Sequence, residues 1–265
     1  MKSIVVKEQP LAVFDEGDGP PLLLVHGFPL DHSMWKPVFP ALVGPYRVIA
    51  PDLPGFGASE PPVHPLHSMS DYARLLLDLL DELHVEEPVS LIGLSMGGYI
   101  GWSFWQQAGG RLRSLIQCDT RAVADDSETS SRRFELAEHV LEHGAAELPA
   151  ILLPRILAPS SQPSHEELVD QVIRMITGAS REGIATASRA MANRPDWTGR
   201  LARMDLPALL LCGAYDSISP PSEMRAMAAA LPNADYREIP DAGHLAPMEN
   251  PVVVGEIIAR FLERH

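Results

Sequence analysis

The sequence contains few cysteines, few basic residues and no long apolar run. Only two of its 265 residues are cysteines, Cys118 and Cys212, and both follow short apolar runs, which predicts buried packing rather than a disulfide framework. Lysine and arginine total 21 against 35 acidic residues, and the formal net charge of −14 argues against nucleic acid or an anionic membrane as a partner. No segment has the length of a membrane span, and the N-terminus lacks the apolar core of a signal peptide. These absences favour a cytoplasmic protein.

Short apolar runs alternate with longer segments of helical period, which is the pattern of a mostly parallel sheet flanked by helices. Hydrophobic residues make up 46% of the chain, enough to bury a large core in an α/β fold. The runs predict eight strands, at 4–7, 11–15, 22–26, 46–50, 89–94, 112–118, 208–212 and 235–239. Helices are expected at 70–83, 96–107, 222–230 and 251–263.

The alternation stops between residues 121 and 205. This stretch reads as several helices without strands, broken by four prolines, Pro149, Pro154, Pro159 and Pro163. We therefore expect residues 1–120 and 206–265 to form one core domain, with residues 121–205 inserted after the sixth strand as a helical lid. The lid should lie over the carboxyl edge of the sheet, where open α/β sheets place their sites.

A serine lies between two glycines at the end of one predicted strand. The segment Gly93-Leu94-Ser95-Met96-Gly97 joins the strand at 89–94 to a predicted helix, as in a nucleophile elbow. A strained turn that exposes the hydroxyl requires small neighbours on either side, because larger side chains would collide with the strand and the helix. An ordinary glycine-rich turn is the alternative interpretation of the pentapeptide alone.

A serine nucleophile needs a base, and the base needs an orienting acid. Asp216 and His244 each follow a later predicted strand, so the chain order is Ser95, Asp216, His244. Two other acids compete for the orienting role: Asp119 follows the strand at 112–118, and Asp241 precedes the histidine. We favour Asp216.

These segments together resemble the α/β-hydrolase fold family. The resemblance rests on His26-Gly27-Phe28-Pro29, Asp52-Leu53-Pro54-Gly55-Phe56-Gly57, the Gly93–Gly97 elbow, Gly213-Ala214-Tyr215-Asp216 and Gly243-His244.

The resemblance implies an α/β-hydrolase fold, with a mostly parallel eight-stranded sheet, and a serine hydrolase mechanism. Ser95 would attack the substrate carbonyl, His244 would move the proton, and Asp216 would hold the imidazole. The backbone N–H groups of Phe28 and Met96 would form the oxyanion hole. The implied activity is that of a carboxylesterase on small to medium apolar esters. The alternatives are a lactonase for enol-lactones or acyl-homoserine lactones, a cofactor-free perhydrolase, and a non-catalytic binding protein of the same fold.

Substrate contacts are the least specific part of the pattern. Leu30 and Trp197 are candidates for an apolar pocket, although core packing explains each of them equally well. Arg121 could bind a substrate carboxylate, but pairing with one of the acids at 125, 126 or 128 is the favoured interpretation. No histidine spacing predicts a metal site, no glycine-rich phosphate loop predicts a nucleotide, and we expect no cofactor. The expected partner is a small ester or lactone, bound by a monomer or homodimer.

Overall fold

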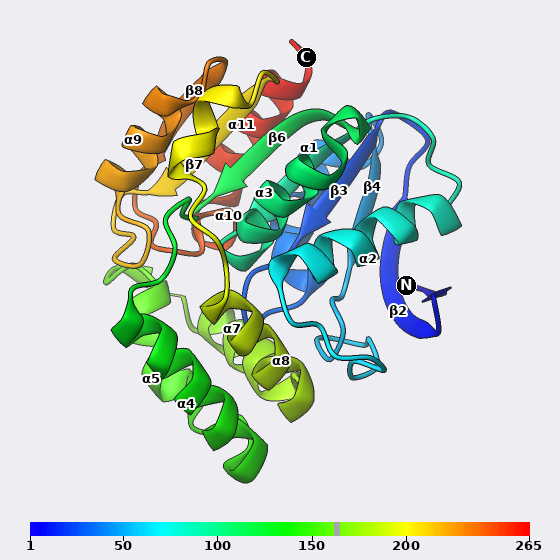
Figure 1. Cartoon of the computed structure of the whole chain (residues 1–265). Helices are drawn as coiled ribbons and strands as arrows, with labels where there is room; N and C mark the ends of the chain where they lie inside the picture. The colour runs from blue at the N-terminus through cyan, green and yellow to red at the C-terminus, as the bar shows by residue number, and fades with distance from the viewer. Residues whose placement is uncertain (162–164) are drawn as a thin grey trace.

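The computed structural model describes residues 1–161 and 165–265 and contains a twisted sheet of eight strands (Figure 1). The strand order is β1-β2-β4-β3-β5-β6-β7-β8. The β1–β2 and β2–β4 pairs are antiparallel, and the other five pairs are parallel. The predicted α/β-hydrolase architecture is confirmed. The strands are β1 (Lys2–Val6), β2 (Gln9–Glu16), β3 (Pro21–Val25), β4 (Arg47–Pro51), β5 (Val89–Leu94), β6 (Leu112–Cys118), β7 (Ala208–Gly213) and β8 (Ala234–Ile239).

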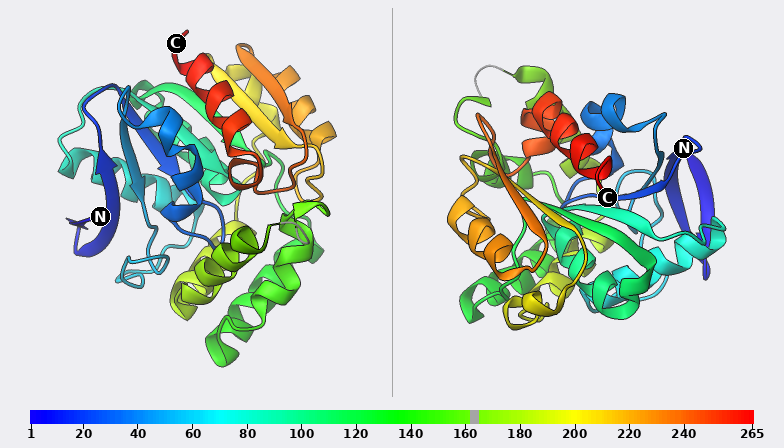
Figure 2. Two further views of the ribbon diagram at one scale, coloured as in Figure 1. Left: turned by 180° about the vertical axis from the view of Figure 1, so that it is seen from behind. Right: turned by 90° about the horizontal axis from the view of Figure 1, so that it is seen from above.

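Helices cover both faces of this sheet. Figures 1 and 2 show α2 and α3 on one face and α1 and α11 on the other. Every residue of β3 and β5 is buried, as expected for central parallel strands covered on both faces. The helices and 3-10 turns outside the insertion are η1 (His32–Val38), α1 (Phe39–Leu42), α2 (Met69–Glu82), α3 (Met96–Ala108), η2 (Gly109–Arg111), α9 (Pro221–Ala230), α10 (Ala246–Glu249) and α11 (Pro251–Leu262).

The segment between β6 and β7 is helical wherever the structure assigns it regular elements. Figure 1 shows its long helices grouped together at one end of the sheet. The described elements are α4 (Ser127–His143), α5 (Leu148–Ile156), α7 (Glu166–Gly178), α8 (Arg181–Ala192) and η3 (Thr198–Arg203). Pro163, one of the four predicted breaks, lies outside the described residues. The division into a core and a lid remains a prediction, and we call residues 121–205 the helical insertion.

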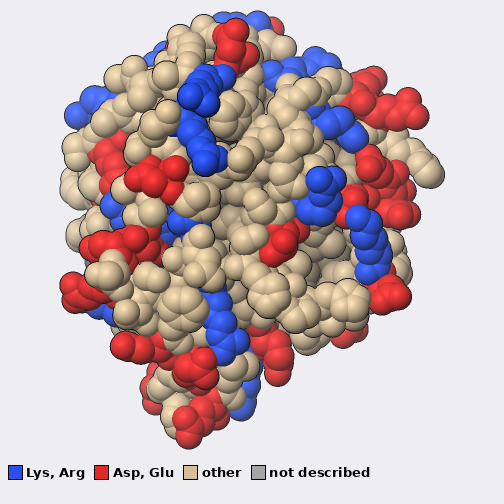
Figure 3. Space-filling view, in the orientation of Figure 1, with Lys and Arg blue, Asp and Glu red and all other residues tan. Residues whose placement is uncertain are grey.

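Charged side chains are spread over the surface. Figure 3 shows acidic and basic residues interspersed on one face, so the net charge of −14 is not gathered there in a single patch. Within the residues described, no helix combines the length and the apolar character needed to cross a membrane.

Candidate active site

Ser95 occupies a strained turn between β5 and α3. Its backbone angles are φ 52° and ψ −107°, a conformation that a residue with a side chain rarely adopts. Hydrogen bonds to the end of β6 and to the loop that follows it hold the turn: Ser95 N donates to Cys118 O at 2.9 Å, and Thr120 Oγ1 donates to Ser95 O at 2.7 Å. The side chain is half-buried. Such strain at a strand–helix junction is typical of an exposed nucleophile.

Two glycines allow the backbone to pass close to this turn. A Cβ atom on Gly97 would lie 2.2 Å from Val25 O, so helix α3 could not approach β3 with any larger residue there. A Cβ atom on Gly27 would lie 2.5 Å from Leu94 Cδ2 and 3.6 Å from Ser95 Cβ. The loop after β3 therefore lies directly beside Ser95.

Asp216 and His244 form a buried hydrogen-bonded pair. His244 Nδ1 lies 2.8 Å from Asp216 Oδ2, and the two residues are 3% and 4% exposed. The other carboxylate oxygen, Oδ1, accepts from the backbone N–H groups of Ile218 at 2.8 Å and Ser219 at 3.0 Å. Burial alone would raise the pKa of Asp216, but the neighbouring His244 and these backbone donors hold that pKa below its ordinary value. Asp216 is therefore an ionised partner for the imidazole.

All three predicted residues lie at the carboxyl edge of the sheet. The parallel register aligns Leu94, Cys118 and Leu211 in one row across β5, β6 and β7. Ser95 is the next residue after this row, while Asp216 and His244 follow β7 and β8. The structure thus brings together the acid and the base that the sequence predicts, and it places the serine at the same edge.

The two expected oxyanion donors occupy suitable backbone positions. Met96 is the first residue of α3, and an N–H at the start of a helix has no acceptor within that helix. Phe28 lies inside a tight turn in which Leu30 N donates to Gly27 O at 2.9 Å. That the N–H groups of Met96 and Phe28 form an oxyanion hole remains a prediction.

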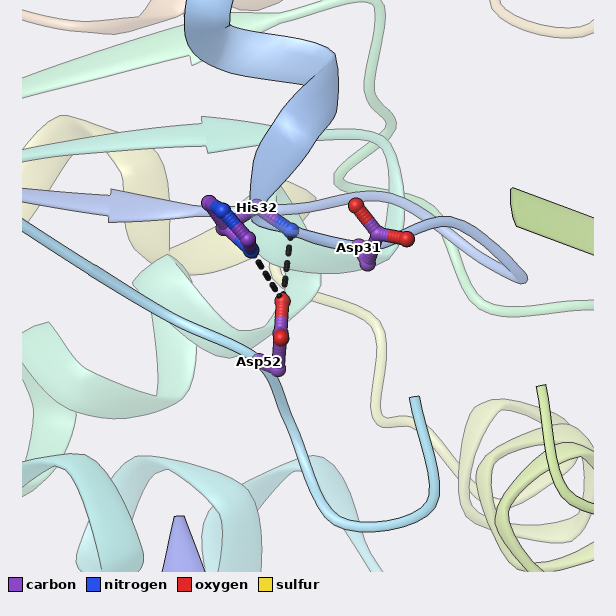
Figure 4. A group of neighbouring side chains, drawn as sticks. All are labelled: Asp31, His32 and Asp52. Carbon is purple, nitrogen blue, oxygen red and sulfur yellow. Dashed lines mark hydrogen bonds and ion pairs between the residues drawn. The ribbon is translucent and has the colours of Figure 1, made fainter. Parts of the chain in front are cut away.

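Two buried residues, His26 and Asp52, hold in place the loops beside the Ser95 turn. His26 Nε2 accepts from Leu53 N at 3.0 Å, so Nδ1 carries the proton and donates to Gly27 O at 2.9 Å. Burial lowers the pKa of His26, which keeps the ring neutral in this role. Asp52 Oδ1 lies within 2.8 Å of both His32 N and His32 Nδ1 (Figure 4).

Asp31 lies near the His32–Asp52 pair, so these three side chains offer oxygen and nitrogen atoms within 4.8 Å of one another. Asp31 accepts from Ser33 N at 2.7 Å, and Asp52 Oδ2 accepts from Ala58 N at 2.9 Å. Each of these two contacts lies within one loop, whereas the hydrogen bonds between His32 and Asp52 anchor the loop after β3 to the loop after β4.

The structure corrects the expected partner of Arg121. Its Nε donates to both carboxylate oxygens of Glu223 in α9, at 2.9 and 3.1 Å, rather than to the acids at 125, 126 and 128. Sequence reasoning missed this pair because its members lie 102 positions apart.

The two apolar pocket candidates are packed in the interior. Leu30 is 1% exposed and belongs to the hydrophobic core. Trp197 is 2% exposed; its ring meets Trp105 edge to face, and the Arg200 guanidinium lies over it. Both positions fit the packing interpretation, and contact with a substrate remains a prediction.

Sequence reasoning also missed Glu249, which lies in the short helix α10. Its Oε1 accepts from Gly243 N at 2.8 Å and Leu245 N at 3.3 Å, on either side of His244. Its Oε2 accepts from Ala158 N and Ser161 Oγ, both at 2.7 Å, in the helical insertion. One carboxylate thus ties the insertion to the loop that carries His244. The only local signal is an acid shortly after that histidine.

Glu249→Ala should remove this anchor. We expect the mutation to lower the free energy of unfolding by about 3 kcal/mol, because four donors lose a charged acceptor. We also expect kcat to fall by about tenfold, because the loop that carries His244 becomes less fixed. Denaturant unfolding and ester turnover measure the two effects. Glu256→Ala is the matched control, since Glu256 is exposed and pairs with Arg260 across one helical turn; an equal loss in both variants would contradict the anchoring role.

Comparison with known proteins decides the family. The sequence profile of the alpha/beta hydrolase fold matches residues 20–251. The chain belongs to the alpha/beta hydrolase fold family. This alpha/beta hydrolase is 27% identical over 247 residues to 3-oxoadipate enol-lactonase 1 of Acinetobacter baylyi, covering 93% of this chain and 90% of the relative.

Solved structures are similar over the whole chain. A thermophilic esterase from Thermogutta terrifontis, solved with malate bound, has a TM-score of 0.95 and 40% identity to this alpha/beta hydrolase, covering 99% of this chain and 98% of that one. The enol-lactonase from Burkholderia xenovorans LB400 has a TM-score of 0.91 and 25% identity, covering 99% of this chain and 100% of that one. Esterases and enol-lactonases are therefore both among the relatives.

Proposed function

We propose that this alpha/beta hydrolase is a serine carboxylesterase that acts on small to medium apolar esters through Ser95, His244 and Asp216. The observation that carries the proposal is the buried Asp216–His244 pair at the same sheet edge as a serine held at φ 52°. A family fold alone would not establish catalysis, because the fold also supports other functions. The intact set of nucleophile, base and acid favours an enzyme over a binding protein.

The hydrogen bond to Asp216 determines which ring nitrogen of His244 reacts. Because Nδ1 faces Asp216, its proton stays there and Nε2 is the atom left to accept a proton from Ser95 Oγ. Oγ attacks the ester carbonyl, and the imidazolium then protonates the departing alcohol, which leaves an acyl group on Ser95. Water reacts by the same route in reverse, releasing the acid and restoring the serine.

The negative oxygen formed at each attack needs fixed donors. The N–H groups of Met96 and Phe28 would supply them, each contributing roughly 3 kcal/mol of transition-state stabilisation. Because the donors belong to backbone that close glycine contacts hold in place, they would need little rearrangement during the reaction.

A lactonase is the second candidate, because enol-lactonases are among the relatives. An enol-lactone that carries a carboxylate would need a free cation near the site. Arg121, the cation that the sequence suggests for this task, is paired with Glu223. This pairing favours a neutral ester as the substrate over a carboxylate-bearing lactone.

A substrate panel tests the proposal. We expect p-nitrophenyl esters of short to medium acyl chains to be hydrolysed with kcat/KM at least about tenfold above enol-lactones and acyl-homoserine lactones. Glu223→Gln, which frees Arg121, sharpens the comparison. If the lactones are the better substrates, and Glu223→Gln improves the carboxylate-bearing one further, the esterase assignment is wrong. Peracid formation exceeding ester hydrolysis when hydrogen peroxide is added would indicate a perhydrolase instead.

A further inference from the structure

A second aspartate is buried beside the Asp216–His244 pair. Asp119 follows β6, is fully buried, and has a positive φ of 47°. Its Oδ1 accepts from Gly213 N at 2.7 Å, and its backbone oxygen accepts from Ser219 Oγ at 3.2 Å. A polar side chain is rarely buried this deeply without a specific task.

The two partners of Asp119 begin and end the turn that carries Asp216. Within that turn, Asp216 N donates to Gly213 O at 3.1 Å, and Ser219 N donates to Asp216 Oδ1 at 3.0 Å. Asp119 therefore fastens both ends of the turn to the end of β6. A shift of Asp119 would move the carboxylate that orients His244.

The charge state of Asp119 follows from its surroundings. Among the residues described, its second oxygen, Oδ2, has no hydrogen-bond partner. One oxygen of Asp119, one oxygen of Asp216 and Cys212 Sγ all lie within 4.8 Å of one another. Two buried carboxyl groups this close are not both ionised at moderate cost, and Asp216 is the one with a histidine partner. The proton thus belongs on Asp119.

We propose that Asp119 is a positioning residue that holds the Asp216 turn in place as a neutral carboxylic acid. The proposal rests on the proposed function, in which Asp216 orients the catalytic base. Because Asp119 is fully buried, it would act on the reaction through Asp216.

On balance, the groups that face Asp119 favour its protonated form. Burial and the charge of Asp216 raise the pKa of Asp119 well above its ordinary value, and Glu249 adds to this effect. The backbone N–H groups of Gly213 and Ala246 favour the ionised form but are outweighed. The neighbouring thiols of Cys118 and Cys212 also have raised pKa values, mainly through burial, so they stay neutral.

The pH dependence of stability tests the proton directly. The folded protein keeps the proton of Asp119 at pH values where the unfolded chain, with a pKa near 4, has lost it. The folded state then binds more protons, so its stability falls as pH rises towards the raised pKa. Asp119→Asn removes this loss. As pH rises from about 5 towards the raised pKa of Asp119, we therefore expect the Tm of Asp119→Asn to increase relative to that of the wild type by about 3–5 °C per pH unit.

The readout is how the difference in Tm between Asp119→Asn and the wild type changes with pH. Packing changes caused by the substitution shift Tm equally at every pH and so do not alter this slope. Ser95→Ala is the control and should show no slope relative to the wild type. If the Tm of Asp119→Asn minus that of the wild type stays constant or decreases with rising pH, Asp119 is not neutral in the folded protein. Fluorophosphonate labelling of Ser95 is scored separately, so failure of the proposed function and failure of this inference are distinguishable.

Kinetics test the positioning role. Asp119→Ala leaves Gly213 N without its acceptor, so kcat should fall by about 10- to 100-fold while KM changes little. Asp119→Asn keeps an oxygen for Gly213 N and should recover most of that kcat. Asp119→Asn should also leave the acid limb of the plot of kcat against pH unchanged, because the substitution removes no charge beside His244. A shift of that limb to lower pH would mean that Asp119 is ionised in the wild type.

Infrared spectroscopy covers the case in which a variant fails to fold. Wild-type protein labelled with carbon-13 aspartate should show the carbonyl band of a protonated aspartic acid at about pH 6, roughly two units above the ordinary pKa of an aspartate. Absence of that band contradicts the proposal without any mutation. Where Asp119→Asn folds, the band should vanish in it.

Discussion

Replacement of Ser95 by alanine is expected to lower kcat for ester hydrolysis by a factor of about 10⁶, as for other serine nucleophiles. The substitution removes the only atom that forms the acyl-enzyme bond, while the remaining groups still bind the ester. The Ser95 backbone angles impose strain on either residue, so the fold should persist. Steady-state turnover of a p-nitrophenyl ester, with circular dichroism to verify folding, measures the effect.

Ser103 provides the matched control for Ser95. It lies in α3, the helix that follows Ser95, is 1% exposed, and donates its hydroxyl to Tyr99 O within that helix. Ser103→Ala removes the same hydroxyl group eight positions further along the chain, so kcat should stay within about threefold of the wild type. Comparable losses in the two variants would mean that the hydroxyl of Ser95 has no special chemical role.

Asp216→Asn is expected to lower kcat by about 10⁴ while leaving the fold intact. The amide would present an N–H to His244 Nδ1, which moves the ring proton to Nε2, the atom that must accept the proton of Ser95. The shape of the site is unchanged, so the loss reflects the wrong tautomer. Turnover of the same ester across pH measures it.

Asp119→Asn is the comparison that assigns the acid. Both aspartates follow strands at the same edge of the sheet, but His244 is hydrogen-bonded to Asp216. We expect Asp119→Asn to lose far less activity than Asp216→Asn. The opposite ranking would make Asp119 the orienting acid.

Much of this fold is readable from local sequence patterns. Two central strands, Val89–Leu94 and Leu112–Cys118, match their predicted bounds because apolar residues predominate in them and nearly all of their residues are buried. The short elements His32–Val38 and Ala246–Glu249 were missed, since a 3-10 helix of seven residues and an α-helix of four are too short to leave an apolar repeat of α-helical period in the sequence. Tertiary contacts, rather than local propensity, stabilise such pieces.

Local sequence patterns likewise predict some residues of the candidate site and not others. Ser95, Asp216 and His244 each follow a predicted strand, so a rule about sheet edges predicts their placement. The contacts that support them join distant positions: Asp119 and Gly213 are 94 residues apart, and Arg121 and Glu223 are 102 apart. No local pattern encodes such pairs. Charge alone suggested partners for Arg121 close in sequence, and the folded chain supplied one from α9 instead.

Covalent labelling by a fluorophosphonate tests the central claim most directly. Such reagents react with a serine only when a base activates it and an oxyanion site accepts the developing charge. The account predicts one label per chain, mapped by peptide mass spectrometry to Ser95, lost in Ser95→Ala and strongly slowed in Asp216→Asn. Folded wild-type protein that stays unlabelled, or that carries its label on another residue, would contradict it.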